Sequence, residues 1–321
     1  MNVEKCGSGS ASTAATATLT ARIAQLKKER GAVILAHYYV RPEIQEVADY
    51  VGDSLALARI AQTLPDPVIV MCGVNFMGET AKILCPDKTV LLPDPEAGCS
   101  LADSCPADSF AAFIKAHPGH TVISYVNTTA QVKALTDIVV TSGNARKIVE
   151  SLPEDEKIIF GPDRNLGNYI NAVTGRSMVL WDGACHVHEQ FDPEAIVRLK
   201  KEHPQARVLV HPECPAPVRL LADCTGSTAA LLKYAQESDA REFIVATESG
   251  ILHGMTKACP DKTFIPAPPT GGCGCNNCSF MKLITLQKLH DCLLNLSPAV
   301  EVDAALADRA RRPIERMLSM S

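Results

Sequence analysis

VILAHYYVRPEIQEVADYVGDS (33–54) is the most informative stretch of this chain, because both of its halves recur twice downstream. The recurring segments are VISYVNT (122–128) with LTDIVVTS (135–142), and VLVHPEC (208–214) with LADCTGST (221–228). Each copy carries an aspartate followed 5 positions later by Ser or Thr, and these aspartates are Asp49, Asp137 and Asp223. Their spacings of 88 and 86 residues predict three copies of one structural unit.

Every unit alternates short β-branched runs with helical stretches. Continuous apolar runs bounded by turn residues are typical of buried parallel strands. Alternation of strands and helices predicts parallel sheets with helices on both faces and right-handed crossovers. The expected fold is therefore α/β, with three αβα domains related by a pseudo-three-fold axis and a small parallel sheet in each. Ligands of such sheets bind beyond the carboxyl ends of the strands, which predicts an active site on the pseudo-axis.

Turn-forming residues mark the joins between units, at His117-Pro118-Gly119 and at His203-Pro204. The expected organisation comprises a disordered tail, three α/β repeats called units 1, 2 and 3, and a C-terminal helical tail, at 1–20, 30–112, 113–200, 201–296 and 297–321 respectively.

Composition narrows the class of protein. A chain of 321 residues can bury a large core, and its net charge of −5 carries no basic excess of the kind that binds nucleic acid. No apolar run approaches the roughly 20 residues that span a bilayer, so no membrane partner is expected. Thirteen cysteines are unusual, yet a long aliphatic chain needs no disulfides, and a reducing cytoplasm fits best. Six cysteines are interpreted as small core residues: Cys72, Cys85, Cys214, Cys224, Cys259 and Cys292.

Polar residues are expected at alternate positions where the first strand of each unit ends. The pairs are His37 with Tyr39, Tyr125 with Asn127, and His211 with Glu213. Side chains two apart share one face of a strand, so each pair can point into one cavity. The pairs occupy equivalent positions but differ chemically, which favours a shared site with divided roles. The alternative interpretation is that these side chains only form hydrogen bonds at the strand ends and have no role in a site.

Hydroxyl side chains follow the second strand of each unit, at Ser54, Ser142 and Ser227-Thr228, where a helix is expected to begin. Ser and Thr are common N-caps. Helix N-termini also bind anions through free N–H groups and the helix dipole. Both roles are open, and three such ends around one cavity would suit a substrate rich in carboxylates or phosphate.

One cysteine closes each unit, at Cys99, Cys185 and Cys278. The CxxC of Cys275 and Cys278 on its own suits half a zinc site or a redox pair. No second CxxC appears, and a ferredoxin needs four clustered thiolates. Three separated thiols favour an iron–sulfur cluster with one iron free of protein ligands. Such an iron is a Lewis acid, which points to dehydration or condensation.

Motifs along the chain resemble those of the quinolinate synthase family. They are ILAHYY, VADYVGDS, MCGVNFMGETAKILCPDKTVLLP, GCSLADSC, YVNTTAQVKALTDIVVTS, WDGACHVHEQF, VHPECP and GSTAALL, in order over 30–285. The resemblance implies a cytoplasmic transferase of NAD biosynthesis. It would condense iminoaspartate with dihydroxyacetone phosphate to quinolinate, phosphate and water. An enzyme that oxidises or dehydrogenates aspartate would supply the iminoaspartate.

The resemblance also implies a [4Fe–4S] cluster on Cys99, Cys185 and Cys278 with one open iron. Implied substrate-binding residues are His37, Tyr39, Ser54, Tyr125, Asn127, Ser142, His211, Glu213 and Thr228, and Ser227 is added to them from its place at the expected helix start. Glu213 with His211 is the expected acid–base pair, with Tyr39 or Tyr125 as proton donor or relay. Cys105 is the alternative first ligand. Cys275 is the alternative third ligand, or the partner of Cys278 in a regulatory disulfide, and SFMKLIT after Cys278 departs from the family pattern.

Two other classes of function remain open from the sequence. An electron-transfer or redox-sensing iron–sulfur protein would use the CxxC as a switch and would not need His37, Glu213 or Thr228. A zinc-stabilised module that binds phosphorylated metabolites would contain zinc without iron or sulfide. Neither class explains why the strand-end pairs diverge at equivalent positions.

Overall fold

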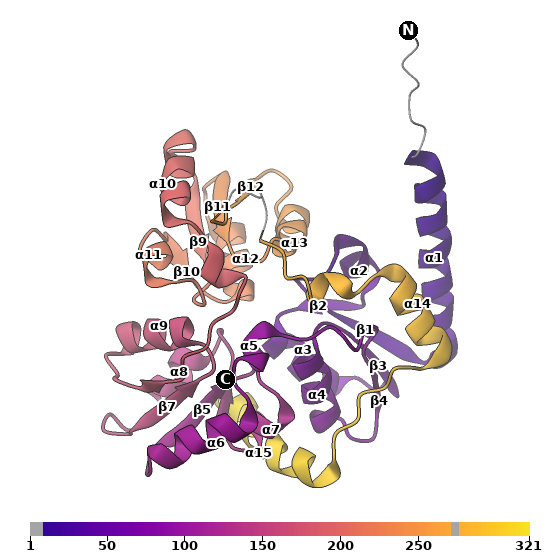
Figure 1. The fold of residues 1–321 in the computed structure, drawn as a ribbon. Helices are drawn as coiled ribbons and strands as arrows, with labels where there is room; N and C mark the ends of the chain where they lie inside the picture. The colour runs from indigo at the N-terminus through magenta and orange to yellow at the C-terminus, as the bar shows by residue number, and fades with distance from the viewer. Residues whose placement is uncertain (1–8, 271–275) are drawn as a thin grey trace.

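Three four-stranded parallel sheets form the framework of the computed structural model, which describes residues 9–270 and 276–321, with side chains from residue 16 onward (Figure 1). The strand orders are β2-β1-β3-β4, β6-β5-β7-β8 and β10-β9-β11-β12. The order is the same in all three sheets, with the first strand of each unit inside and the second at one edge. The expected α/β fold with three small parallel sheets is confirmed.

The elements follow the predicted alternation. Unit 1 contains β1 (Ala32–His37), α2 (Pro42–Val47), β2 (Tyr50–Gly52), α3 (Ser54–Thr63), β3 (Val68–Cys72), α4 (Asn75–Leu84), β4 (Thr89–Leu91) and α5 (Ser100–Asp103). Unit 2 contains α6 (Ala107–Ala116), β5 (Thr121–Tyr125), α7 (Ala130–Lys133), β6 (Ile138–Val140), α8 (Ala145–Glu150), β7 (Ile158–Gly161), α9 (Arg164–Thr174), β8 (Val179–Leu180) and the 3₁₀ turn η1 (His188–Gln190). Helix α10 (Pro193–Glu202) crosses the expected boundary at 200, and unit 3 contains β9 (Arg207–Val210), α11 (Ala216–Arg219), β10 (Cys224–Thr225), α12 (Thr228–Glu237), β11 (Glu242–Ala246), α13 (Ile251–Ala258) and β12 (Thr263–Pro266).

The repeated aspartate connects the first two strands of every unit. Its carboxylate accepts a hydrogen bond from a main-chain N–H near the start of the first strand, at 2.8 Å each time, in the pairs Asp49 with Ile34, Asp137 with Val122, and Asp223 with Val208. Its own N–H donates to the carbonyl of that same residue, at 2.8–2.9 Å. The aspartate thus fixes the very short second strand against the first, which explains its recurrence.

Both ends of the chain pack around units 1 and 2. Helix α1 (Gly9–Arg30) lies beside α14 (Leu286–Asn295), which follows the 3₁₀ turn η2 (Met281–Leu283). Helix α15 (Ala304–Met320) packs on β6, α7 and α4. Of the tail expected at 1–20, residues 1–8 lie outside the described residues and residues 9–20 belong to α1.

The other expected domain boundaries stay predictions. The one at 112 falls within α6, whose Phe110 packs with Val122 and Ile159 of unit 2. The residues after Met281, which were assigned to unit 3 up to 296, pack against units 1 and 2.

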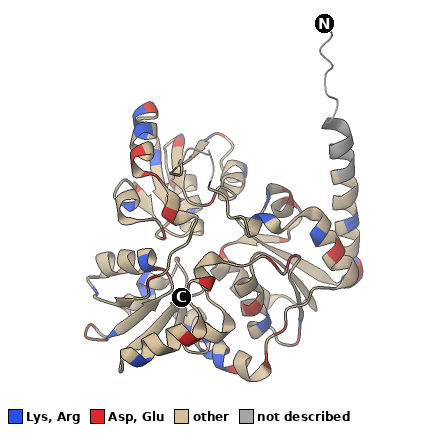
Figure 2. Cartoon of the chain, viewed as in Figure 1, with Lys and Arg blue, Asp and Glu red and all other residues tan. Residues whose placement is uncertain are grey.

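Units 1 and 2 share one hydrophobic cluster with α14 and α15, whereas unit 3 has two clusters of its own. Charged residues of both signs are spread over all three units (Figure 2). Within the described ranges, no helix combines the length and the apolar character needed to cross a membrane.

Candidate active site

One cavity, here called the central cavity, lies where the carboxyl ends of the three sheets converge, and side chains from all three units line it. Twelve of the thirteen predicted site residues are among its lining: His37, Tyr39, Ser54, Cys99, Tyr125, Asn127, Ser142, Cys185, His211, Glu213, Thr228 and Cys278. Segments up to 241 residues apart in sequence therefore meet at one place, as the repeat pattern predicted.

The expected role of the hydroxyl residues as caps is confirmed at Ser227 and is wrong at Ser54 and Ser142. Asp53, one residue ahead of Ser54, caps α3 by accepting the N–H of Ala56 at 2.9 Å. Ser227 caps α12 by accepting the N–H of Ala230 at 3.3 Å, which makes Ser227 the one predicted site residue that does not line the central cavity. Because other residues cap these helices, Ser54 and Thr228 occupy the first helical position and line the cavity.

The third expected helix start is also displaced. Helix α8 begins at Ala145, three residues after Ser142, and no side chain caps it. The prediction that Ser142 begins a helix is therefore wrong: the intervening turn places Asn144 at the cap position, where its Oδ1 accepts the N–H of Thr141 at 2.6 Å. Ser142 still lines the cavity, beside the phenol of Tyr125.

Two buried histidines are held in the same tautomer by equivalent main-chain contacts. The N–H of Tyr39 donates to Nδ1 of His37 at 3.2 Å, and the N–H of Glu213 donates to Nδ1 of His211 at 3.4 Å. Burial lowers the pKa of each imidazole from 6.5 to about 3, against a smaller opposing effect of Glu213. Both rings are therefore neutral at pH 7, with the proton on Nε2 and available for donation.

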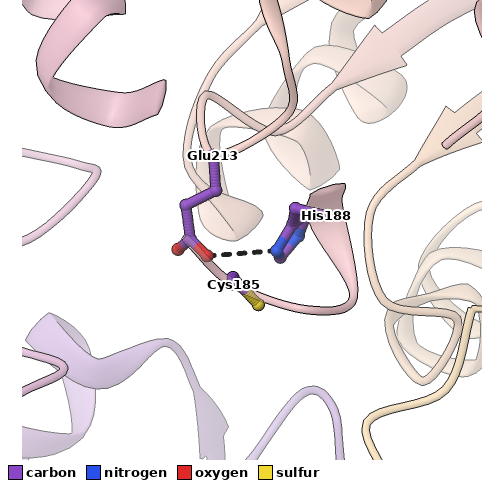
Figure 3. A group of neighbouring side chains, drawn as sticks. All are labelled: Cys185, His188 and Glu213. Atoms are coloured by element: carbon purple, nitrogen blue, oxygen red, sulfur yellow. Dashed lines mark ion pairs between the residues drawn. The ribbon is translucent and has the colours of Figure 1, made fainter. Parts of the chain in front are cut away.

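Glu213 is an ionised carboxylate in a buried position. Burial alone would raise its pKa, but His188, His211 and a hydrogen bond from Tyr125 outweigh burial and hold the pKa below its usual range. The phenol of Tyr125 donates to Oε1 of Glu213 at 2.5 Å, a charge-assisted hydrogen bond. Nδ1 of His188 lies 3.1 Å from Oε2, although without the alignment of a hydrogen bond (Figure 3).

A second set of contacts joins unit 1 to unit 3. The Tyr39 hydroxyl shares hydrogen bonds with Oγ1 of Thr228 at 2.9 Å and with Oγ1 of Thr247 at 2.7 Å. Thr247 also contacts Nε2 of His188, at 2.9 Å. Burial raises the pKa of Tyr39 and of Tyr125 well above the ordinary value, so both phenols keep their protons.

The three predicted ligand cysteines are free thiols on the cavity wall. Burial raises the pKa of all three, that of Cys99 to about 12, and Cys99 is coupled electrostatically to both Cys278 and Cys185. A cation is what would stabilise three buried thiolates. The donor set therefore fits a thiophilic metal centre.

These thiols are not gathered tightly enough to ligate one ion. Over the described part of the chain, the one group of three donor atoms within 4.8 Å of one another is Cys185, His188 and Glu213 (Figure 3). Three thiols around one cavity, but spaced wider than a single-ion site, suit a cluster in which each thiolate binds a different metal atom.

Comparison with known proteins identifies the family. A family model described as Quinolinate synthetase A protein matches residues 21–319. The chain belongs to the quinolinate synthase family. The quinolinate synthase of Nostoc punctiforme is 57% identical over 303 residues, which cover 94% of this chain and 94% of that protein. That of Thermosynechococcus vestitus is 57% identical over 304 residues, covering 94% of this chain and 95% of that protein.

Several polar residues of this quinolinate synthase family member were missed by sequence reasoning. His186, His188 and Glu248 line the cavity, whereas Asp163 and Thr247 lie behind it and bind lining residues. The two histidines lie one and three residues after Cys185 in CHVHE, and this closeness to a predicted ligand could have identified them from the sequence. The others follow buried third strands, where a single acid or threonine resembles an ordinary helix cap.

The two cysteines expected as alternative metal ligands differ in their location. Cys105 is 1% exposed and packs with Phe110, Val122, Val132 and Ile159, apart from the cavity lining. Cys275 lies outside the described residues, and so does any disulfide between it and Cys278.

Proposed function

We propose that this enzyme condenses iminoaspartate with dihydroxyacetone phosphate to form quinolinate, phosphate and water in NAD biosynthesis, acting as a transferase. Membership of the quinolinate synthase family supports the product. The observation that carries the proposal is a single cavity in which three thiols, two neutral histidines and an ionised Glu213 meet. An aspartate-oxidising or aspartate-dehydrogenating enzyme would supply iminoaspartate, and a cytoplasmic location would keep the thiols reduced.

Cys99, Cys185 and Cys278 would hold a [4Fe–4S] cluster with one iron lacking a protein ligand. When bound, the cluster supplies a Lewis acid that coordinates an oxygen of the substrate and assists the loss of water. The protein's own contribution is a set of donors and acceptors fixed around that centre before the substrate arrives.

Binding of two anionic substrates is assigned to neutral donors. The Nε2–H groups of His37 and His211 and the hydroxyls of Ser54, Ser142 and Thr228 are on the cavity wall. The N-termini of α3 and α12, each 10 residues long, add free main-chain N–H groups and the positive ends of their dipoles. Asn127 adds an amide from unit 2. Carboxylates and phosphate would thus be held without a buried arginine.

Proton movement is assigned to Glu213 and its neighbours. When the new carbon–carbon bond forms, phosphate leaves the triose with the electron pair of its C–O bond, and a proton must leave the nucleophilic carbon of iminoaspartate. The ionised Glu213 can accept that proton, and His211 beside it can donate from Nε2. Tyr125 and Tyr39 remain protonated and can donate to oxygens that develop negative charge.

The proposal is tested by measuring iron, sulfide and quinolinate formation with anaerobically prepared protein. A positioned base typically contributes about 10²–10⁴-fold, so Glu213→Gln should lower kcat by that order while iron content stays normal. Cys99→Ala, Cys185→Ala and Cys278→Ala should each abolish cluster assembly. Cys105→Ala is the matched control and should keep its iron.

Three results would contradict the proposal. Zinc in place of iron and sulfide would favour a structural metal site. A reversibly reduced cluster without quinolinate formation would favour electron transfer. Near-normal turnover of Glu213→Gln would remove Glu213 from the role of base.

A further inference from the structure

Two buried carboxylates occupy equivalent positions in units 2 and 3. Gly161 of β7 pairs with Ser124 of β5, and Ala246 of β11 pairs with Val210 of β9, so these are equivalent ends of the third strands. Asp163 and Glu248 each stand two residues beyond that end, and both are 0% exposed. Burying a carboxylate is costly unless it is fully hydrogen-bonded, so each of these two is expected to accept hydrogen bonds that offset this cost.

Each carboxylate accepts a hydrogen bond from the main-chain N–H of a candidate ligand cysteine. Oδ2 of Asp163 accepts the N–H of Cys185 at 3.3 Å, and Oε1 of Glu248 accepts the N–H of Cys278 at 3.0 Å. The second oxygen of each binds the start of the following helix. Oδ1 of Asp163 accepts the N–H of Leu166 at 2.7 Å, and Oε2 of Glu248 accepts the N–H of Gly250 at 2.6 Å.

A cap alone does not account for this arrangement. An N-cap needs one acceptor oxygen and works on an exposed surface, whereas here the second oxygen reaches a loop 22 residues away in unit 2 and 30 residues away in unit 3. Glu248 is further matched by the ammonium of Lys282, at 2.8 Å, four residues after Cys278. The carboxylate therefore connects a rigid strand end to the main chain of a cysteine.

Unit 1 uses a different connection at the equivalent position. Cys72 pairs with Ala36 at the corresponding end of β3, and two residues later stands Val74, which has no polar side chain. There the N–H of Asn75 donates to the carbonyl of Ala97 at 2.8 Å, two residues before Cys99. All three cysteine loops are thus attached at the same strand position, by main chain in unit 1 and by a carboxylate in units 2 and 3.

We propose that Asp163 and Glu248 are positioning residues that fix the main chain of Cys185 and Cys278 so that both thiols face the central cavity and retain a metal cluster. This inference rests on the proposed cofactor. Outer hydrogen bonds that orient metal ligands typically change metal affinity about 10–100-fold when removed, so these residues act through the cysteines without touching the substrate.

The experiment measures iron and sulfide per chain after anaerobic reconstitution, the iron affinity from competition with a ferrous chelator, and the urea midpoint. Asp163→Ala and Glu248→Ala should bind iron about 10–100-fold more weakly. Asp163→Asn keeps one acceptor oxygen for two N–H groups, so its iron affinity should fall between wild type and Asp163→Ala. This milder variant preserves the test if the alanine variants do not fold.

Asp137→Ala is the matched control, because Asp137 also accepts a main-chain N–H in unit 2, at 2.8 Å, but at the opposite end of β5. It should lower the urea midpoint without weakening iron binding. The inference is overturned if Asp163→Ala and Glu248→Ala keep wild-type iron affinity, or if Asp137→Ala loses iron to the same extent. Wild-type protein that takes up no iron would instead overturn the proposed cofactor itself.

Discussion

Neutral histidines in a fully buried site make the stability of this protein depend on pH. The folded chain holds His37 and His211 with a pKa of about 3, whereas the unfolded value is 6.5. Between these values the unfolded chain binds protons that the folded chain does not. Folding stability is therefore fully present above about pH 6.5 and is lost as the pH falls.

The expected slope is about 1.4 kcal/mol per pH unit for each histidine. Urea unfolding at a series of pH values from 7 to 5 measures it, in a range above the titration of most carboxylates. His37→Gln should reduce the slope of unfolding free energy against pH by the contribution of one histidine. His120→Gln is the control, because His120 is only partly buried, lies outside the cavity lining and has its ring beside His117 and the carbonyl of Pro118. Equal slopes for His37→Gln and wild type would show that His37 takes up protons in the folded chain as well.

Among the secondary-structure elements, the second strand of each unit is very short, and the repeated aspartate provides an additional attachment to the first strand. β6 has three residues and β10 has two, too few to hold a register by strand pairing alone. The carboxylates of Asp137 and Asp223 supply a fixed attachment to β5 and β9. An Asp to Ala change leaves the buried main-chain N–H of the partner residue without that acceptor.

Asp137→Ala and Asp223→Ala should each lower the free energy of unfolding by about 1–3 kcal/mol. The two aspartates share no partner, so the double variant should lower it by the sum of the two effects. Asp137→Asn keeps an acceptor oxygen and should cost clearly less. Urea denaturation provides all of these values, and an Asn variant as unstable as the Ala variant would show that the hydrogen bond is not what stabilises β6.

Sequence reasoning located the strands, the cysteines and most of the cavity lining, but not the residues that hold the cysteine loops in place. The strands could be predicted because they are apolar runs with turn residues at both ends. The recurring segments also placed His37, Tyr125 and His211 at equivalent strand ends. Helix α3 begins at Ser54 as expected, but Asp53 rather than Ser54 caps it, and α8 begins three residues after Ser142, with Asn144 at the cap position.

Other features depended on distant contacts that no local pattern carries. Asp163 and Glu248 have a role only because loops 22 and 30 residues away return to them. Helix α1 has an Ala- and Thr-rich start typical of disorder, although Leu19, Ile23 and Leu26 repeat at helical spacing and pack in the main core. The helical spacing of these apolar residues indicates an ordered helix, although the composition of the segment indicates disorder.

For the whole molecule, units 1 and 2 share one apolar core, whereas unit 3 is joined to them at the cavity by polar contacts and by Tyr38 and Tyr39, which pack on its own core. The main core spans units 1 and 2 and both terminal helices. Unit 3 meets unit 1 through Tyr39 with Thr228 and Thr247, and meets unit 2 through Tyr125 with Glu213. The site is therefore also the junction of the three units.

Helix α15 is the element that seals the apolar junction, since it packs on α4 of unit 1 and on α7 and β6 of unit 2. Ile314 is 0% exposed at the centre of this packing, whereas Glu315 beside it faces solvent. Ile314→Ala should lower the free energy of unfolding by about 2–5 kcal/mol through lost contacts and a cavity. Glu315→Ala, the matched control, should change it by about 0.5 kcal/mol or less.

Iron bound per folded chain should stay at the wild-type level in Ile314→Ala, because the residue lies outside the cavity lining. Urea denaturation and iron analysis on the same sample separate the two effects. An unchanged urea midpoint would mean that α15 does not dock on units 1 and 2 in solution. A loss of iron from fully folded Ile314→Ala would mean that the junction between units 1 and 2 sets the geometry of the cysteines, so that the apolar core and the metal site could no longer be treated as independent.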